Sequence, residues 1–269
     1  MAVRSSSISR RFSSGPRARA TVLSLREEIG APILVGTHHR AGTVWMADVF
    51  RGVCSTLDLR FFSARQDDVP PDFDVFVHEH SRFRFSDLPE HRGLHMIRDP
   101  RDVIVSGCFY HQTSAEEWLH ERRPEYGGMT YQERLRGYST FEDQLLFEMQ
   151  EVGSHTLHEM LSWDYSQANF WEAKYEELIV DVELTLFRQV FEFLNFPHKV
   201  MPQCLKIVDQ RSIWSATVFN RRHVRSGAAG QWKTYFNETH RRRFSELFGD
   251  ALVQLGYESD DRWVMAEEP

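Results

Sequence analysis

The fold class of this protein can be read from the stretch APILVGTHHRAGTVWM, residues 31–46. Its apolar run, residues 33–35, has the length and composition of a short buried strand. A polar turn around Arg40 follows, and an amphipathic pattern begins at Gly42. A strand, a glycine-bearing turn and a helix in this order predict a βα unit. Such a turn presents unpaired backbone N–H groups and the positive end of a helix dipole, which together suit an anion.

The rest of the chain alternates between strand-like and helix-like patterns. The strand-like runs cover residues 32–35, 73–77, 93–97 and 170–175. Helical spacing of apolar residues covers 46–57, 187–194 and 244–255, with Gly256 as the C-cap of the last helix. Strands separated by helices predict a parallel sheet, in which ligands bind beyond the carboxyl ends of the strands. We therefore predict an α/β fold: a single domain with a central parallel β-sheet flanked by helices, in a P-loop-like architecture.

Composition limits the classes of function. With 41% hydrophobic and 13% aromatic residues, the 269-residue chain can bury a core. Its net charge of −7 argues against broad nucleic-acid binding, which requires a positive field. Cys54, Cys108 and Cys204 have no zinc-site spacing and are interpreted as packed, reduced thiols. No apolar run approaches the ~18 residues of a membrane span, so we expect no integral membrane segment.

The two ends of the chain differ from its middle. The first twenty residues contain five arginines, six serines and no acidic residue. We predict that residues 1–28 form a disordered basic tail in a cytoplasmic protein, and the alternative is a transit peptide to an organelle. The folded domain is predicted to span residues 29–258, and an acidic C-terminal tail to span residues 259–269.

The glycine-bearing turn departs from the nucleotide triphosphate loop. That loop has four residues between its glycines and then a lysine, whereas five residues separate Gly36 from Gly42 and Thr43 follows. Because the lysine that reaches the terminal phosphates is missing, phosphoryl transfer from ATP is disfavoured.

Two later segments could bind further anions. In HMIRDPRDVIVSGCFYH, residues 95–111, Arg98 follows a strand and Ser106 lies two helical turns further on. Both could hold a second phosphate, because arginine presents a fork of donors; alternatively, Arg98 forms a structural salt bridge with a neighbouring aspartate. In VRSGAAGQWKTYF, residues 224–236, the backbone could close over an anion, or the segment is a solvated glycine-rich connection.

Together, these segments resemble the motifs of PAPS-dependent sulfotransferases. THHRAGTVW resembles the family's 5′-phosphosulfate loop, RDPRDVIVS its 3′-phosphate segment, and RSGAAGQWK its C-terminal Arg-Lys-Gly-x-x-Gly-Asp-Trp-Lys. WEAKYEELIVDVELTLFRQVFEFLNFP is similar to its Tyr-Glu strand end and following helix. The likeness covers residues 31–257 and implies a sulfotransferase domain of the cytosolic type, in a distant branch, with a sulfotransferase/nucleotide-kinase-like fold. The implied reaction moves a sulfuryl group from PAPS to a hydroxyl or amine and releases PAP.

The resemblance also implies a role for individual residues. The 5′-phosphate would be held by Arg40, Ala41, Gly42, Thr43 and Val44. Arg40 takes the place of the family's catalytic lysine on the bridging oxygen, although its fork of donors differs from a point charge. The 3′-phosphate would be held by Arg98, Ser106, Arg225, Ser226 and Gly227. The adenine would lie against Trp45 and Tyr175, in a pocket closed by Ser212 and Trp214.

A general base is expected in VFVHEHSRF, residues 75–83. His80 takes the place of the family's catalytic histidine, and imidazole has a pKa suited to this role. His78 and Glu79 are the alternatives. No third ligand accompanies the two histidines, so we expect no metal. His38 and His39 are interpreted as solvated loop residues that could add donors near the phosphosulfate.

Some properties stay open at this stage. The hydroxyl-bearing acceptor could be a small molecule, a lipid or a glycan. The family's dimer pattern is altered after Lys233, so the oligomeric state is not assigned. The competing functions are a P-loop-related kinase of a small molecule and a non-catalytic nucleotide-binding relative.

Overall fold

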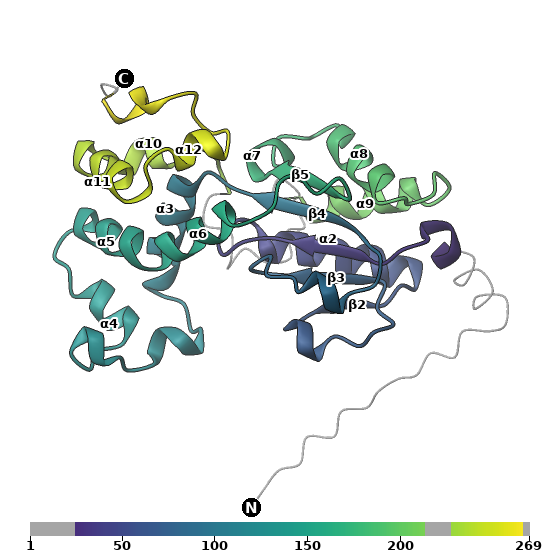
Figure 1. Cartoon of the computed structure of the whole chain (residues 1–269), viewed down its shortest axis with the longest axis horizontal. Helices are drawn as coiled ribbons and strands as arrows, with labels where there is room; N and C mark the ends of the chain where they lie inside the picture. Colours follow the sequence, from purple (N-terminus) through teal and green to yellow (C-terminus); the bar gives the residue numbers. More distant parts are fainter. Residues whose placement is uncertain (1–24, 213–226, 266–269) are drawn as a thin grey trace, which may run out of the picture.

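Five parallel strands form one sheet in the order β2-β3-β1-β4-β5 (Figure 1). This computed structural model describes residues 25–212 and 227–265. The strands are β1 Ile33–Gly36, β2 Phe61–Ser63, β3 Val75–His78, β4 Arg92–Ile97 and β5 Phe170–Lys174. The central strand β1 pairs with β3 and β4, and all strand pairs are parallel. The predicted α/β fold class is confirmed.

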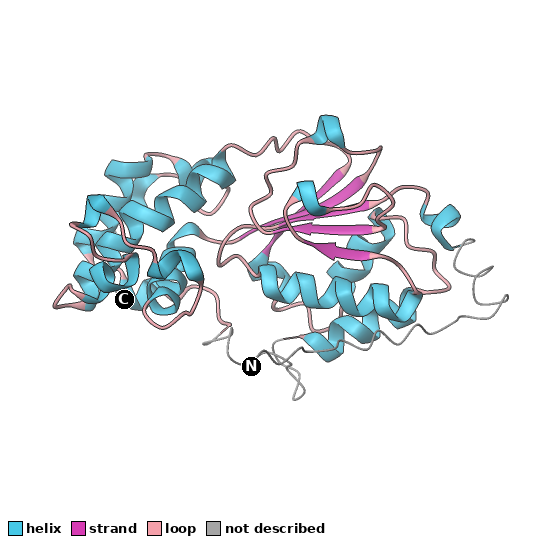
Figure 2. Cartoon of the chain, turned by 90° about the horizontal axis from the view of Figure 1, so that it is seen from below, coloured by secondary structure: helices cyan, strands magenta, loops and turns pink. Residues whose placement is uncertain are grey.

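The sheet separates two apolar clusters because side chains alternate along each strand. Ile33 and Val35 belong to the larger cluster, which also contains side chains of the helices below the sheet in Figure 2. Leu34, between them, faces the opposite side and joins a smaller cluster with Phe76 and Trp163.

The helices form two groups (Figures 1 and 2). One group packs on the sheet and consists of α2 Thr43–Leu57, α8 Thr185–Phe193 and α9 Met201–Arg211. The short α7 Tyr175–Leu178 follows β5. The other group has its own apolar core and consists of α3 Pro100–His111, α4 Tyr131–Arg136, α5 Phe141–Glu148, α6 Ser154–Leu161, α10 Trp232–Tyr235, α11 Glu238–Phe248 and α12 Ala251–Gln254.

Helices α5 and α6 are continuous through a π-helical turn, Met149–Gly153. All three pieces keep right-handed helical dihedrals at their junctions. The resulting rod packs against α3. π-turns often occur near functional sites, because the inserted residue changes the direction in which the following side chains point.

The structure differs from the predicted elements in β2, in the helix over 244–255, and in the helices α4, α5, α6 and α9, which were not predicted. β2 was not predicted, because its three residues are half-buried or exposed and lack a clear apolar pattern. The predicted helix over 244–255 is wrong: it is two helices, divided at Gly249 with φ 56° and ψ −122°. This backbone conformation is accessible mainly to glycine, so the helix cannot continue through it. Gly256, with φ 69°, ends α12 as expected.

Packed residues extend into both predicted tails. Residues 25–29 are helical, and Leu25 and Ile29 are buried in the larger core because the sheet offers them an apolar surface. Trp263 is buried in the helical group. Residues 1–24 and 266–269 are outside the described chain, so the assignment of tails there stays a prediction.

The three cysteines are free and buried, as expected from their spacing. Over residues 25–212 and 227–265, no helix combines the length and apolar character needed to cross a membrane. The cellular location stays a prediction.

Candidate functional site

The candidate site lies where four parallel strands end. The loop with Arg40 follows β1, and the segment with His80 follows β3. Arg98 follows β4, and Tyr175 follows β5. The carboxyl ends of parallel strands meet at one edge of a sheet, which is where α/β folds bind their ligands. The fold therefore brings together segments that are more than 100 residues apart.

The loop after β1 is a tight turn with two left-handed residues. Arg40 has φ 60° and Gly42 has φ 97°. The Thr43 hydroxyl donates to the His38 carbonyl oxygen at 3.1 Å and lies 2.8 Å from the Thr37 hydroxyl. These contacts fix the turn against the start of α2. The N-cap of this 15-residue helix is Gly42, which has no side chain to cap the first turn, so the N–H groups of that turn can bind an anion.

Gly42 is needed because of its neighbours as well as its backbone. A Cβ atom at this position would lie 2.9 Å from Met96 Cε and 3.0 Å from Tyr175 Cδ2. Both contacts are shorter than van der Waals distance. The loop therefore packs directly on β4 and on the end of β5.

Arg40 is directed toward α3. Its Nε donates to the Ser106 hydroxyl at 3.1 Å, and its guanidinium lies 4.0 Å from the centre of the Tyr110 ring. Burial lowers the pKa of Arg40 from its usual value. The residue predicted for the bridging oxygen and one predicted for the 3′-phosphate are thus in direct contact.

Arg98 connects three segments of the site. It donates to the carbonyl oxygens of Arg40 and Ala228, each at 3.2 Å. Its guanidinium lies 4.6 Å from the centre of the Tyr175 ring and 3.6 Å from the Asp102 carboxylate. Arg98 therefore forms the predicted salt bridge with a neighbouring aspartate and also joins the loop after β1 to the glycine-rich segment. Arg98 Nε is buried and has no hydrogen-bond partner among the described residues.

The glycine-rich segment that begins at Gly227 is hydrogen-bonded to Tyr175 and Asp102, next to Arg98. The Tyr175 hydroxyl donates to the Gly227 carbonyl oxygen at 3.0 Å. The buried Asp102 carboxylate accepts hydrogen bonds from the backbone N–H of Gly230 at 2.7 Å and of Trp232 at 2.9 Å. Burial raises the pKa of Asp102, although the charge of Arg98 opposes this. Trp214, Arg225 and Ser226 lie outside the described residues.

Two residues predicted to contact the adenine, Trp45 and Ser212, are buried and make contacts within the protein. Trp45 is only 8% exposed, and its ring meets Tyr175 and Phe187 edge to face at 6.0 Å and 5.7 Å. Most of its surface therefore belongs to the core. Ser212 is buried at the end of α9, where its hydroxyl donates to the Asp209 carbonyl oxygen at 2.7 Å.

His78 and His80 differ in their surroundings. Burial lowers the pKa of His78 to about 4, and its Nδ1 accepts the backbone N–H of His80 at 3.2 Å. The side chain of His80 is 34% exposed, and its Nδ1 lies 3.0 Å from the carboxylate of Glu159 on α6. This hydrogen bond raises the pKa of His80. Of the two rings, His80 is the better suited to accept a proton near neutral pH.

The interpretation of His38 and His39 as solvated loop residues is wrong. His38 is fully buried, and its Nε2 lies 2.9 Å from His95 Nε2, whose Nδ1 lies 2.6 Å from the Glu172 carboxylate. His39 is partly buried. Its Nε2 lies 2.8 Å from Nε2 of His111 on α3.

The contact between His39 and His111 is extended by a carboxylate on the α5–α6 rod. His111 Nδ1 lies 2.9 Å from the buried Glu148 carboxylate, which also accepts the Tyr131 hydroxyl at 2.7 Å. Two imidazole–imidazole–carboxylate lines therefore begin at consecutive residues of the loop after β1. They anchor this loop on one side to β4 and β5 and on the other to α3 and α5.

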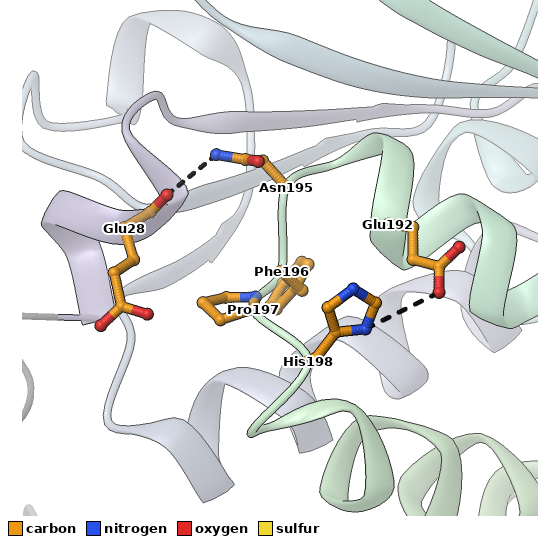
Figure 3. Close-up of a pocket in the computed structure, with 6 residues that line it drawn as sticks. All are labelled: Glu28, Glu192, Asn195, Phe196, Pro197 and His198. Atoms are coloured by element: carbon orange, nitrogen blue, oxygen red, sulfur yellow. Dashed lines mark hydrogen bonds and ion pairs between the residues drawn. The ribbon is translucent and has the colours of Figure 1, made fainter.

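A separate pocket lies at the opposite end of β1, near its amino end (Figure 3). It is lined by Glu28, Glu192, Asn195, Phe196, Pro197 and His198. Asn195 donates to the Glu28 carbonyl oxygen at 2.8 Å. None of the predicted site residues lines this pocket. In the described part of the chain, no group of three or more His, Cys, Asp or Glu side chains has an arrangement that could hold a metal ion.

A family model described as Sulfotransferase domain matches residues 86–256, which is more than half of the chain. The chain belongs to the sulfotransferase family. This confirms the family that the sequence motifs predict. The matched region of the sulfotransferase includes the Arg98 and glycine-rich segments, whereas the loop after β1 and His80 precede it.

A solved structure shares the fold of this sulfotransferase, and a second aligns with it less closely. The crystal structure of mouse sulfotransferase SULT7A1 complexed with PAP aligns with a TM-score of 0.54 and 17% identity, over 92% of this chain and 93% of that chain. A structure of retinol dehydratase in complex with androsterone and inactive cofactor PAP aligns with a TM-score of 0.46 and 16% identity, over 87% and 85%. No curated protein sequence matches the chain.

Glu159 is the site-lining residue that sequence reasoning missed. It lies 79 residues after His80 on a helix with no motif of its own. The segment with His78 and His80 predicts a histidine base, but nothing in the local sequence identifies the carboxylate partner of His80. Only the packing of the α5–α6 rod brings the two together.

Proposed function

We propose that this sulfotransferase moves a sulfuryl group from PAPS to a hydroxyl or amine and releases PAP. The main support is the convergence of the loop after β1, Arg98, Tyr175 and Gly227 at one edge of the sheet. This is the arrangement that a nucleotide held at both phosphate ends requires. SULT7A1, which shares the fold, has PAP in its crystal structure.

The residues present fit such a nucleotide. The uncapped start of α2 and the close approach allowed by Gly42 suit the 5′-phosphate. Arg98 Nε, which has no partner among the described residues, is a donor for the 3′-phosphate, together with Ser106. In our proposal Arg225 and Ser226, outside the described residues, also bind this phosphate. Trp45, Tyr175, Ser212 and Trp214 surround the adenine.

The chemistry follows from the residue types. The bond between sulfur and the bridging oxygen breaks, and a new bond forms between sulfur and the acceptor oxygen or nitrogen. Arg40 stabilises the charge that develops on the departing phosphate, which is electrostatic stabilisation of the transition state. His80 accepts the proton of the acceptor at Nε2. No metal is assigned a role, and the acceptor is a small molecule, a lipid or a glycan.

The deciding experiment incubates the full-length protein with radiolabelled PAPS and a panel of phenols, aliphatic alcohols, sterols, amines and sugars. Label transfer to at least one acceptor class, with release of PAP, is expected. Thermal unfolding with PAP, with ATP–Mg and with buffer separates the alternatives. Stabilisation by ATP–Mg and not by PAP would support a kinase, and PAP binding without turnover on any acceptor would support a non-catalytic relative.

Replacing the base tests the assignment within the site. We expect His80→Ala to reduce turnover by a factor on the order of 100 or more while leaving PAP binding intact. Unchanged turnover would transfer the role to His78 or Glu79.

A further inference from the structure

Glu159 is a buried carboxylate that faces the proposed base. Its side chain is 6% exposed, and its Oε2 lies 3.0 Å from His80 Nδ1. It lies on α6, in the second half of the rod that follows the π-turn. A carboxylate in this position is costly to bury unless cations or donors surround it.

Cationic and polar side chains surround Glu159. Arg82 Nη2 lies 2.5 Å from Oε1. His38 Nδ1 lies 3.7 Å from Oε2, and His155 Nε2, one helical turn before Glu159, lies 3.7 Å from Oε1. Burial alone would raise the pKa of Glu159, but His38, His80 and Arg82 lower it to about 2. Glu159 is therefore ionised throughout the neutral range.

The ionised carboxylate fixes the tautomer of His80. A carboxylate only accepts hydrogen bonds, so the ring must donate from Nδ1. In the neutral ring the lone pair then lies on Nε2, which is the atom that the proposed reaction uses as base. The groups that face His80 from its own segment are Glu79, 3.9 Å from Nε2, and His78, whose Nδ1 accepts the His80 backbone N–H.

His38 lies behind the carboxylate, with its Nδ1 3.7 Å from Glu159 Oε2, which is too long for a hydrogen bond. Its Nε2 lies 2.9 Å from Nε2 of His95 on β4, and His95 in turn contacts Glu172 on the edge strand β5. The carboxylate therefore packs against a ring that is fixed to β4. Such backing matters because a base must be held within a fraction of an ångström of its working position.

We propose that Glu159 is the positioning residue for proton transfer, orienting His80 and stabilising the imidazolium that forms as the sulfuryl group leaves PAPS. This inference rests on the proposed function of the site. In the step, the acceptor's O–H or N–H bond breaks and its proton binds His80 Nε2. The acceptor atom bonds to sulfur, and the bridging oxygen of PAP keeps the electron pair. Glu159 stays ionised and pairs with the new positive charge.

The test uses Glu159→Gln in the full-length protein, because glutamine keeps the shape and removes the charge. The histidine Cε1–H signal of His80, assigned by comparison with His80→Ala, is titrated by NMR. We expect the midpoint to move to lower pH in Glu159→Gln, because the ion pair that favours the protonated ring is lost. Turnover from PAPS at the pH optimum should fall by about 10-fold, with the acid limb of its pH profile displaced in the same direction and PAP binding unchanged.

His155→Gln is the matched control. His155 is exposed and approaches Glu159 and Arg82, so its replacement perturbs the same carboxylate without removing its charge. Neither the His80 midpoint nor the acid limb should move in this variant. If Glu159→Gln does not fold, Glu159→Asp keeps the charge and shortens the side chain, and it should lower turnover with less change in the midpoint.

The outcomes separate this inference from the proposed function. An unmoved His80 midpoint in Glu159→Gln would overturn the role of Glu159, whatever the activity of the protein. A moved midpoint with full turnover would also overturn it, because the pair would then be structural. Full turnover in His80→Ala would instead overturn the proposed base, and the role of Glu159 with it.

Discussion

Gly42 shows how one residue positions the loop after β1. Its φ of 97° is unfavourable for other residues. A Cβ atom at this position would also lie closer to Met96 and Tyr175 than the van der Waals distance. We expect Gly42→Ala to lower the free energy of unfolding by about 2 kcal/mol or more, and to weaken PAP binding. Urea unfolding and calorimetric titration with PAP measure the two effects.

Gly128→Ala is the control for this prediction. Gly128 also has a positive φ, 84°, but nothing lies within 4 Å of a Cβ atom there. Its replacement should cost only about 1 kcal/mol, from the backbone conformation alone. Equal losses in the two variants would show that the contacts with Met96 and Tyr175 are unimportant.

Arg40 gives a second prediction at this scale. A lysine would keep the charge but would lose both the Nε hydrogen bond to Ser106 and the guanidinium stacking on Tyr110. We expect Arg40→Lys to reduce turnover by about 10-fold and Arg40→Met by a factor on the order of 100. Turnover and PAP affinity are measured separately. Full turnover in Arg40→Met would mean that Arg40 does not act on the departing phosphate.

At the scale of elements, the α5–α6 rod carries the two carboxylates that pair with histidines near the loop. Glu148 precedes the π-turn and pairs with His111, and Glu159 follows it and pairs with His80. The rod approaches α3 closely at Gly153. A Cβ atom there would lie only 2.7 Å from Ile104 Cγ1 on α3.

Gly153→Ala tests this contact. Alanine favours a helix over glycine by about 1 kcal/mol, but the overlap with Ile104 opposes this gain. We expect a net loss of about 1 kcal/mol or more of unfolding free energy, measured by urea unfolding. In a double-mutant cycle, Ile104→Ala should make the Gly153→Ala change less costly because it removes the overlapping atoms. Independent, additive effects would contradict the proposed contact.

For the whole molecule, the buried histidines predict how stability depends on pH. Burial lowers the pKa of His38 to about 4 and that of His95 to about 3, whereas burial raises the pKa of Glu172 to about 7. Below the usual histidine pKa of about 6.5, the unfolded chain binds protons at both histidines that the folded chain does not bind. Falling pH therefore favours unfolding.

Glu172 acts in the opposite direction. Its raised pKa means that the folded chain holds a proton that the unfolded chain has lost, so its contribution decreases as pH rises from about 4.5 to about 7. Two histidines outweigh one carboxyl group. As the pH falls from 6.5 to 4.5 we expect these three groups to lower the free energy of unfolding by on the order of 1 kcal/mol per pH unit.

Urea unfolding at a series of pH values measures this slope. His95→Gln removes one of the two histidines and should flatten the curve in the same range, whatever its effect on stability at pH 7. A curve as steep in His95→Gln as in the natural protein would show that these groups do not control the acid response.

Most strands and several site residues could be predicted from the sequence. The strands β1, β3 and β4 were found because they contain buried apolar runs, whereas β2 is too short and exposed to produce such a pattern. Arg40, Arg98 and Tyr175 were found because each lies in a segment with a motif. Their meeting is a consequence of parallel strands ending at one edge.

The α/β class, the sulfotransferase family and the segments that follow the strands can be inferred from the amino-acid sequence, because strand periodicity, turns and motifs are local properties. The pairing of side chains depends on the packed chain: Glu159 with His80, Glu148 with His111, and Arg98 with the carbonyl oxygens of Arg40 and Ala228. A buried imidazole or carboxylate takes its pKa and its tautomer from its partners. Those partners lie on other elements, and packing alone brings them within hydrogen-bond distance.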